Sequence, residues 1–177
     1  MPDLLRKRRF TAKDVRLTAV KNFYCGDEKW EQELADWIKG PVIQDMTHYG
    51  CEVWLYYTRR SGRPELVGYG SLGEPPWIYP KPSKKHPNII PNLAIHTRFQ
   101  GQPTGPHDER YSTQILSDLI LTAKSRVDRS PLLVLFVHPQ NLRAIRVYER
   151  VGFVPFQKTY TDPTTGETYH SMILDLG

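Results

Sequence analysis

A tyrosine on a short helix, directly after a buried strand, is the side chain of this sequence best placed to do chemistry. The strand is predicted over Leu132–Val137, an apolar run rich in branched residues that suits a strand covered on both faces. The helix starts at Asn141, a good N-cap, and stops at Gly152, with Tyr148 on its apolar face. A phenol with a pKa of ~10 stays protonated at neutral pH, so Tyr148 is a candidate proton donor. The alternative is that its ring only packs in the core.

A second segment joins a predicted strand to a loop that contains glycine and glutamine. Leu93, Ala94 and Ile95 belong to the strand, and Gln100-Gly101-Gln102-Pro103-Thr104-Gly105 follows before the next helix. A glycine-rich turn into a helix N-terminus offers amide hydrogens and a favourable dipole to a phosphate group. The segment is a candidate phosphate-binding loop, although any strand and helix need a connection.

Both segments resemble motifs of the GNAT superfamily of acyl-CoA N-acyltransferases. The order Asn141, Ala144, Tyr148, Gly152-Phe153 resembles the last motif of that superfamily, in which the tyrosine hydroxyl faces the thioester sulfur. Residues 93–105 look like its central strand and pyrophosphate loop. The resemblance spans residues 66 to 156 and implies a GNAT-like α/β (mixed α+β) fold. In that fold a mixed central sheet with a splayed parallel strand pair is flanked by helices.

The resemblance also implies an activity. An acetyl group would move from acetyl-CoA to a primary amine by direct attack, with Tyr148 protonating the departing sulfur. The strand would meet the pantetheine arm through its backbone, much as an added β-strand would, and an amide near Ile95 would polarise the thioester carbonyl. The implied cofactor-binding residues are Leu93, Ala94, Ile95, Gln100, Gly101, Gln102, Gly105, Ser112 and Asn141.

The loop departs from the usual Gln-Gly-Gln-Gly-x-Gly form. Pro103 stands where the pattern has a glycine, and proline has no amide hydrogen to offer. Two alignments stay open. Either Gly105 is the terminal glycine, or residues 103–110 are an insertion and residues 111–113 supply the amides of the helix start. We slightly favour the second, because it places Ser112, a good capping residue, where the helix begins.

No side chain stands out as a general base. His96 follows the central strand and Glu74 begins a proline-rich segment, but a lone histidine at a strand end is more often structural. An α-amine acceptor with a pKa of ~8 would need only water as its base, whereas a lysine-type amine, near ~10.4, would need more help.

The sequence leaves the identity of the acceptor open. Phe23-Tyr24-Cys25-Gly26 resembles the opening of GNAT toxins that acetylate the amine of aminoacyl-tRNA, and residues 148–156 also look like theirs. A small molecule, a peptide and a charged tRNA are therefore candidate acceptors. Other hypotheses are a noncatalytic module that binds acetyl-CoA and a basic RNA-binding domain.

The composition of the 177 residues, 39% hydrophobic and 24% charged, predicts one globular domain over residues 1–177. No apolar run approaches the ~20 residues that span a bilayer, and no signal peptide is evident, so we expect a cytoplasmic protein without membrane contact. Cys25 and Cys51 form no metal-type pair and the histidines lack ligand spacing, so we expect reduced thiols and no metal. A homodimer is a reasonable expectation.

The net charge of +5 favours anionic partners, of which coenzyme A is one and RNA another. Basic residues gather near the N-terminus, where they are candidates for contact with an RNA backbone or form a solvated edge: Arg6, Lys7, Arg8, Arg9, Lys13 and Arg16.

Periodicity and turn residues predict the remaining elements. They are a helix over residues 28–39, a hairpin of strands 53–58 and 66–72, a loop over 74–91, a strand over 90–95, a helix containing 115–123, and a closing strand over 171–176.

Overall fold

The computed structural model describes residues 5–73, 86–104, 109–126, 128, 130–162 and 165–177. In chain order the elements are β1 (Arg6–Arg9), η1 (Ala12–Arg16), α1 (Thr18–Lys21), α2 (Lys29–Trp37), α3 (Val42–Tyr49), β2 (Glu52–Thr58), β3 (Glu65–Leu72), β4 (Asn88–Ile90), β5 (Leu93–Ile95), η2 (Thr97–Phe99), α4 (Tyr111–Lys124), β6 (Leu132–Val137), α5 (Leu142–Val151), β7 (Val154–Thr161) and β8 (Thr168–Asp175).

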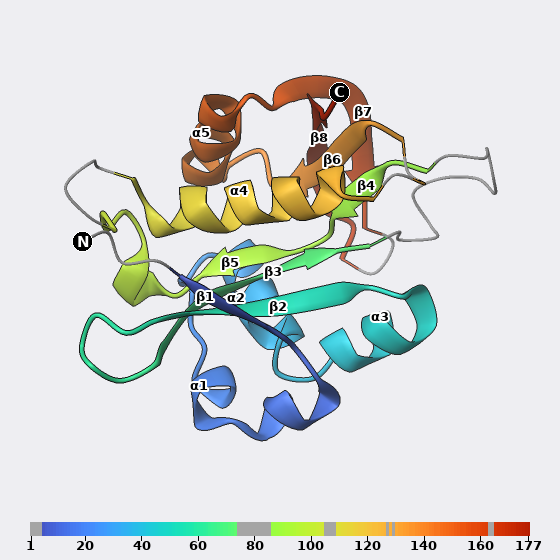
Figure 1. Ribbon diagram of the computed structural model, residues 1–177. Helices are drawn as coiled ribbons and strands as arrows, with labels where there is room; N and C mark the ends of the chain where they lie inside the picture. Colours follow the sequence, from blue (N-terminus) through green and yellow to red (C-terminus); the bar gives the residue numbers. More distant parts are fainter. Residues whose placement is uncertain (1–4, 74–85, 105–108, 127, 129, 163–164) are drawn as a thin grey trace.

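The strands form two sheets (Figure 1). The N-terminal sheet has the order β1-β2-β3-β5 with antiparallel neighbours, and the C-terminal sheet has the order β4-β6-β8-β7. The predicted hairpin is confirmed as β2 and β3, the buried strand as β6, and the closing strand as β8. The sequence did not predict β7, which contains Pro155, a residue that weakens a strand pattern.

One stretch of chain contributes to both sheets. β4 pairs in parallel with β6, whereas β5 pairs antiparallel with β3. Between them Pro91 has no amide hydrogen to donate to a ladder, so the pairing changes there. The single strand predicted over residues 90–95 is therefore corrected to two short strands, and β4 replaces the end of the predicted loop. The predicted splayed parallel pair is confirmed, because β5 leaves β6 and joins the other sheet.

Helices cover both faces of the N-terminal sheet (Figure 1). α1, α2 and α3 pack on one face, where Ile38 and Val42 share a core with Tyr69. α4 covers the other face, where Leu119 shares a core with Tyr56. The predicted helix over residues 28–39 is confirmed as α2, but α3 was not predicted. α2 ends at Trp37, with Ile38 as its C-cap, before the Gly-Pro pair that was expected to end it. Proline also suits a helix start, and Pro41 takes the N-cap position of α3.

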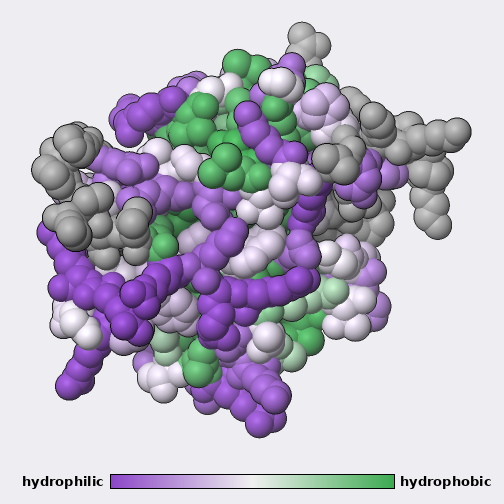
Figure 2. Space-filling view, in the orientation of Figure 1, coloured by the Kyte–Doolittle hydropathy of each residue, from purple (hydrophilic) through white to green (hydrophobic). Residues whose placement is uncertain are grey.

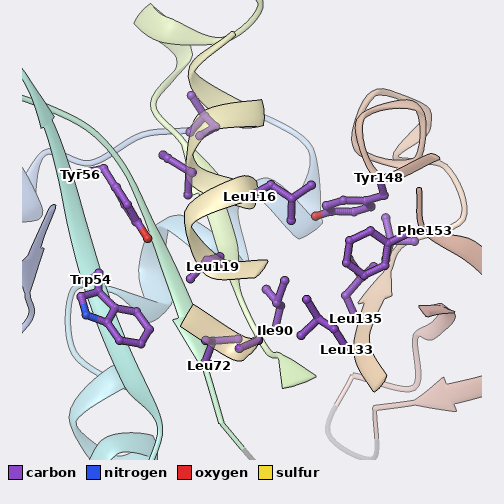
Figure 3. Packing of buried hydrophobic residues seen from close by; sticks show 14 of the residues in the cluster. Trp54, Tyr56, Leu72, Ile90, Leu116, Leu119, Leu133, Leu135, Tyr148 and Phe153 are labelled. Carbon is purple, nitrogen blue, oxygen red and sulfur yellow. The ribbon is translucent and has the colours of Figure 1, made fainter. Parts of the chain in front are cut away.

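Both ends of α5 lie at the residues that the sequence predicted for them. The Asn141 side chain accepts a hydrogen bond from the Ala144 amide at 3.2 Å, and Gly152 ends the helix with a left-handed φ of 112°. The ring centroids of Tyr148 and Phe153 lie 5.9 Å apart. Figure 3 shows both rings beside Leu116 and Leu135, so α5 is anchored between α4 and β6.

Cys25 and Cys51 are buried and form no disulfide. Burial raises the pKa of each thiol to about 12, so both stay protonated at neutral pH. In the part of the chain that the structure describes, no three His, Cys, Asp or Glu side chains gather as a metal site. The helices of that same part are all too short or too polar to cross a bilayer.

Candidate active site

A cleft of about 870 Å³ lies where β5 and β6 separate. Most of the predicted site residues line it: Leu93, Ala94, Ile95, Gln100, Gly101, Ser112, Asn141 and Tyr148. Gln102 does not, because its amide turns back to the Phe99 carbonyl at 3.3 Å. Gly105 lies outside the described residues.

The backbone of β5 presents alternate residues to the cleft. The amide of His96 donates to the Val67 carbonyl, and that of Ser71 donates to the Asn92 carbonyl, so these pairs bond β5 to β3. Hydrogen-bonded and non-hydrogen-bonded pairs alternate in an antiparallel ladder. Leu93 and Ile95 therefore direct their amides and carbonyls away from β3, to the side from which β6 has diverged.

Tyr148 lies in the wall of the cleft with 8% of its surface exposed. Burial raises the pKa of its phenol to about 12. None of the described residues makes a hydrogen bond to its hydroxyl, which Figure 3 shows pointing away from Phe153 toward the side of Leu116. The phenol is thus protonated at neutral pH, and its proton is not shared with any described side chain.

The side chain of Gln100 holds the loop in place. Its Nε2 donates to the Cys25 carbonyl at 2.6 Å and to the Ile95 carbonyl at 3.0 Å, and its Oε1 accepts from the Arg143 guanidinium. The predicted Phe-Tyr-Cys-Gly motif therefore packs against this loop. Gly26 in that motif has a φ of 146°, and a Cβ there would meet the Glu31 carboxylate.

The structure favours the insertion alignment of the loop. Pro103 pairs with Arg110, and the Thr104 amide donates to the Glu109 carbonyl at 2.7 Å, so the two described ends of this segment lie side by side. α4 then begins at Tyr111. Ser112 lies inside the first turn, and Arg110 takes the N-cap position without a side-chain cap, so the prediction of Ser112 as the capping residue is wrong. The Arg110 side chain makes no capping hydrogen bond, and both Arg110 and Ser112 line the cleft, so the positive end of the α4 dipole lies at the cleft.

Sequence reasoning missed the arginines of the cleft. Arg143, Arg146 and Arg150 follow one another about one turn apart on α5 and line the cleft, as does Arg110 before α4. Their spacing along a helix could have revealed a shared face. Guanidinium groups suit phosphate oxygens, so this wall favours an anionic ligand.

Of the two candidate bases, His96 is the one that the structure describes, and it does not line the cleft. Its Nδ1 accepts from the Arg98 amide at 3.2 Å, and its ring contacts Phe23 and Phe99. Burial, with a smaller effect from Arg98, lowers the pKa of His96. These contacts are those of a structural histidine. Glu74 lies outside the described residues.

Four residues of the basic N-terminal cluster form the edge strand β1, whereas Lys13 and Arg16 lie in η1. Figure 2 shows hydrophilic side chains on this face of the molecule. Lys7 pairs with Asp118 at 3.0 Å, Arg8 with Asp14 at 2.8 Å and Arg9 with Glu52 at 2.8 Å. These carboxylates offset much of the positive charge that suggested RNA contact.

No family model and no curated protein sequence matches the chain. Solved structures do match its fold. SpeG, a spermidine/spermine N-acetyltransferase from Vibrio cholerae, is 14% identical over 97% of this chain and 92% of its own, with a TM-score of 0.61. A tyrosine-to-phenylalanine mutant of the toxin AtaT, with the C-terminus of the antitoxin AtaR and acetyl-CoA, is 15% identical over 97% and 93%, with a TM-score of 0.65.

A third match is a protein from Desulfovibrio desulfuricans that is assigned to the GNAT acetyltransferases. It is 14% identical over 98% of this chain and 100% of its own, with a TM-score of 0.64. These matches extend over nearly the whole of each chain, and they agree with the splayed strands described above. The chain therefore has the fold of the GNAT acetyltransferases.

Proposed function

We propose that the protein is an N-acetyltransferase that moves an acetyl group from acetyl-CoA to a primary amine. The observation that carries this proposal is the protonated, unshared phenol of Tyr148 in a cleft formed by two diverging strands. A ligand with an extended amide-bearing arm fits the backbone groups of Leu93 and the amide of Ile95, which point away from β3, whereas the Ile95 carbonyl already accepts from Gln100. Its phosphates fit the first turn of α4 and the arginines of α5.

In this proposal acetyl-CoA supplies an acetyl group activated as a thioester. The Ile95 amide polarises the carbonyl oxygen of that thioester. The neutral amine forms a bond to the carbonyl carbon while the carbon–sulfur bond breaks. Tyr148 gives its proton to the sulfur, the amine loses one proton to water, and the phenolate regains a proton from water. The products are an amide and a free thiol, so atoms and charge balance.

The raised pKa of Tyr148 leads to a prediction about pH. Because the phenol acts in its protonated form and its pKa is about 12, the rate should not fall between pH 6 and about pH 10. The rate should instead rise as the acceptor loses its proton, with an apparent pKa that follows the amine used. The measurement is kcat/KM against pH for two amines of different pKa. A descending limb near pH 8 would contradict the role given to Tyr148.

Thiol release from acetyl-CoA tests the function itself. The protein is incubated with acetyl-CoA and, in turn, polyamines, amino acids, peptides and charged tRNA. Binding is measured separately as the thermal shift that acetyl-CoA produces. Release with at least one amine supports the enzyme. A thermal shift without thiol release would support the noncatalytic module. The absence of both the thermal shift and thiol release would overturn the proposal.

A further inference from the structure

One wall of the cleft is built by two segments that lie far apart in the sequence, α2 and the β7–β8 hairpin. The Trp30 ring of α2 stacks on His138 at the end of β6, with centroids 4.3 Å apart and planes at 15°. The Tyr169 hydroxyl of β8 donates to Glu33 of α2 at 3.1 Å, and Lys29 forms an ion pair with Glu167. α2 is thereby tied to the β7–β8 hairpin.

This wall combines aromatic rings with carboxylates. Trp30, Tyr160 and Tyr169 line the cleft together with Glu33 and Asp162, and all five are half-buried. The rings of Tyr160 and Tyr169 lie 6.4 Å apart, and His138 joins them to Trp30. Aromatic faces attract cations, and nearby carboxylates add to that attraction, most strongly where water is partly excluded.

The lining of the cleft carries both signs of charge, on different elements. Arg143, Arg146 and Arg150 lie on α5, whereas the carboxylates of this wall lie on α2 and the hairpin. The arginine side suits the phosphates of a nucleotide-bearing cosubstrate. The other side repels phosphate, so it suits a second substrate of opposite charge.

A buried acceptor atom lies next to the same wall. Oε2 of Glu167 has no hydrogen-bond partner within the described residues, and the Nε2 atom of His138 is 3.9 Å away. Glu167 does not itself line the cleft, and its other oxygen pairs with Lys29, so it borders the wall without offering a contact to a ligand.

Resting on the function proposed above, we propose that the acceptor is a primary amine that carries a second positive charge, as in an aliphatic diamine or polyamine. The distant ammonium binds against Trp30 and Tyr169, with Glu33 and Asp162 as its counterions. The reacting amine at the other end is neutral and attacks the thioester beside Tyr148. It loses one proton to water as the new carbon–nitrogen bond forms and the thiol leaves.

Three primary amines of the same chain length test this proposal. Putrescine, butylamine and γ-aminobutyrate carry at their far ends a cation, a methyl group and an anion. We expect kcat/KM for putrescine to exceed that for butylamine by about 10-fold or more, and γ-aminobutyrate to be the poorest substrate. The preference should decrease at high salt, which screens the attraction.

Variants of the wall then test whether its residues cause the preference for putrescine over butylamine. Glu33→Gln keeps an acceptor for the Tyr169 hydroxyl but removes the charge, so it should raise KM for putrescine and leave butylamine and acetyl-CoA unaffected. Trp30→Leu should have the same selective effect through the loss of the aromatic face. Glu149→Gln removes an exposed carboxylate of α5 that does not line the cleft, and should change none of these constants.

The outcomes separate this inference from the function on which it rests. Thiol release with equal or better use of butylamine, γ-aminobutyrate or charged tRNA would overturn the dicationic acceptor and leave the acetyltransferase intact. Equal losses for putrescine and butylamine in Glu33→Gln would overturn the role of the wall. No release with any amine would refute the acetyltransferase, and the inference with it.

Discussion

Replacement of Tyr148 by phenylalanine should lower kcat for acetyl transfer by about 100- to 10,000-fold, the usual contribution of a positioned general acid. The KM for acetyl-CoA should change little, because the ring that packs beside Phe153 remains and only the hydroxyl is lost. Steady-state thiol release at varied acetyl-CoA and saturating amine separates the two constants.

Thermal unfolding distinguishes a chemical effect from a structural one. Since no described residue bonds to the Tyr148 hydroxyl, the melting temperature of Tyr148→Phe should equal that of the wild type. Tyr24→Phe is the matched control, because it removes an exposed hydroxyl that donates to Asp27 at 2.6 Å outside the cleft. It should retain full activity. A Tyr148→Phe protein with normal kcat would remove the phenol from the mechanism.

Replacement of Ala144 by tryptophan should abolish acetyl-CoA binding. Ala144 lies in the first turn of α5, lines the cleft and is half-buried, so an indole there would occupy the space between the diverging strands. Helix α5 should still form, because the Asn141 cap bonds to the backbone amide of residue 144 and not to its side chain. We expect the thermal shift caused by acetyl-CoA to disappear.

Leu142→Trp provides the control for that experiment. Leu142 is in the same turn, is 57% exposed and does not line the cleft, so its replacement should leave the thermal shift unchanged. If Ala144→Trp bound acetyl-CoA as the wild type does, the ligand would have to lie elsewhere.

The parts of the fold that depend on local signals could be predicted from the sequence. Leu132–Val137 forms a strand in which Leu133, Val134, Leu135 and Val137 are buried, as its run of branched side chains predicts. Asn141 and Gly152 delimit α5 because their side-chain and backbone properties suit its two ends. These signals placed Tyr148 on the correct helix. Its exposure to a cleft depends on the separation of distant strands, which no local pattern reports.

Other features depend on tertiary pairing. The exchange of partners at Pro91 requires β3 and β6, which lie on opposite sides of it in the sequence. Pro103 and Arg110 pair with each other at the two ends of a short segment that looks like an ordinary loop in the sequence. The wall of Trp30 and Tyr169 joins residues from opposite ends of the chain, so only the fold brings them together.

Hydrogen exchange at β5 tests the central claim most directly, because that claim is that the separated strand binds the thioester arm through its free backbone groups. With saturating acetyl-CoA, the amides of Leu93 and Ile95 should gain more protection from exchange than that of Ala94, which already faces β3. Unchanged exchange at Leu93 and Ile95, under conditions where acetyl-CoA raises the melting temperature, would contradict the account.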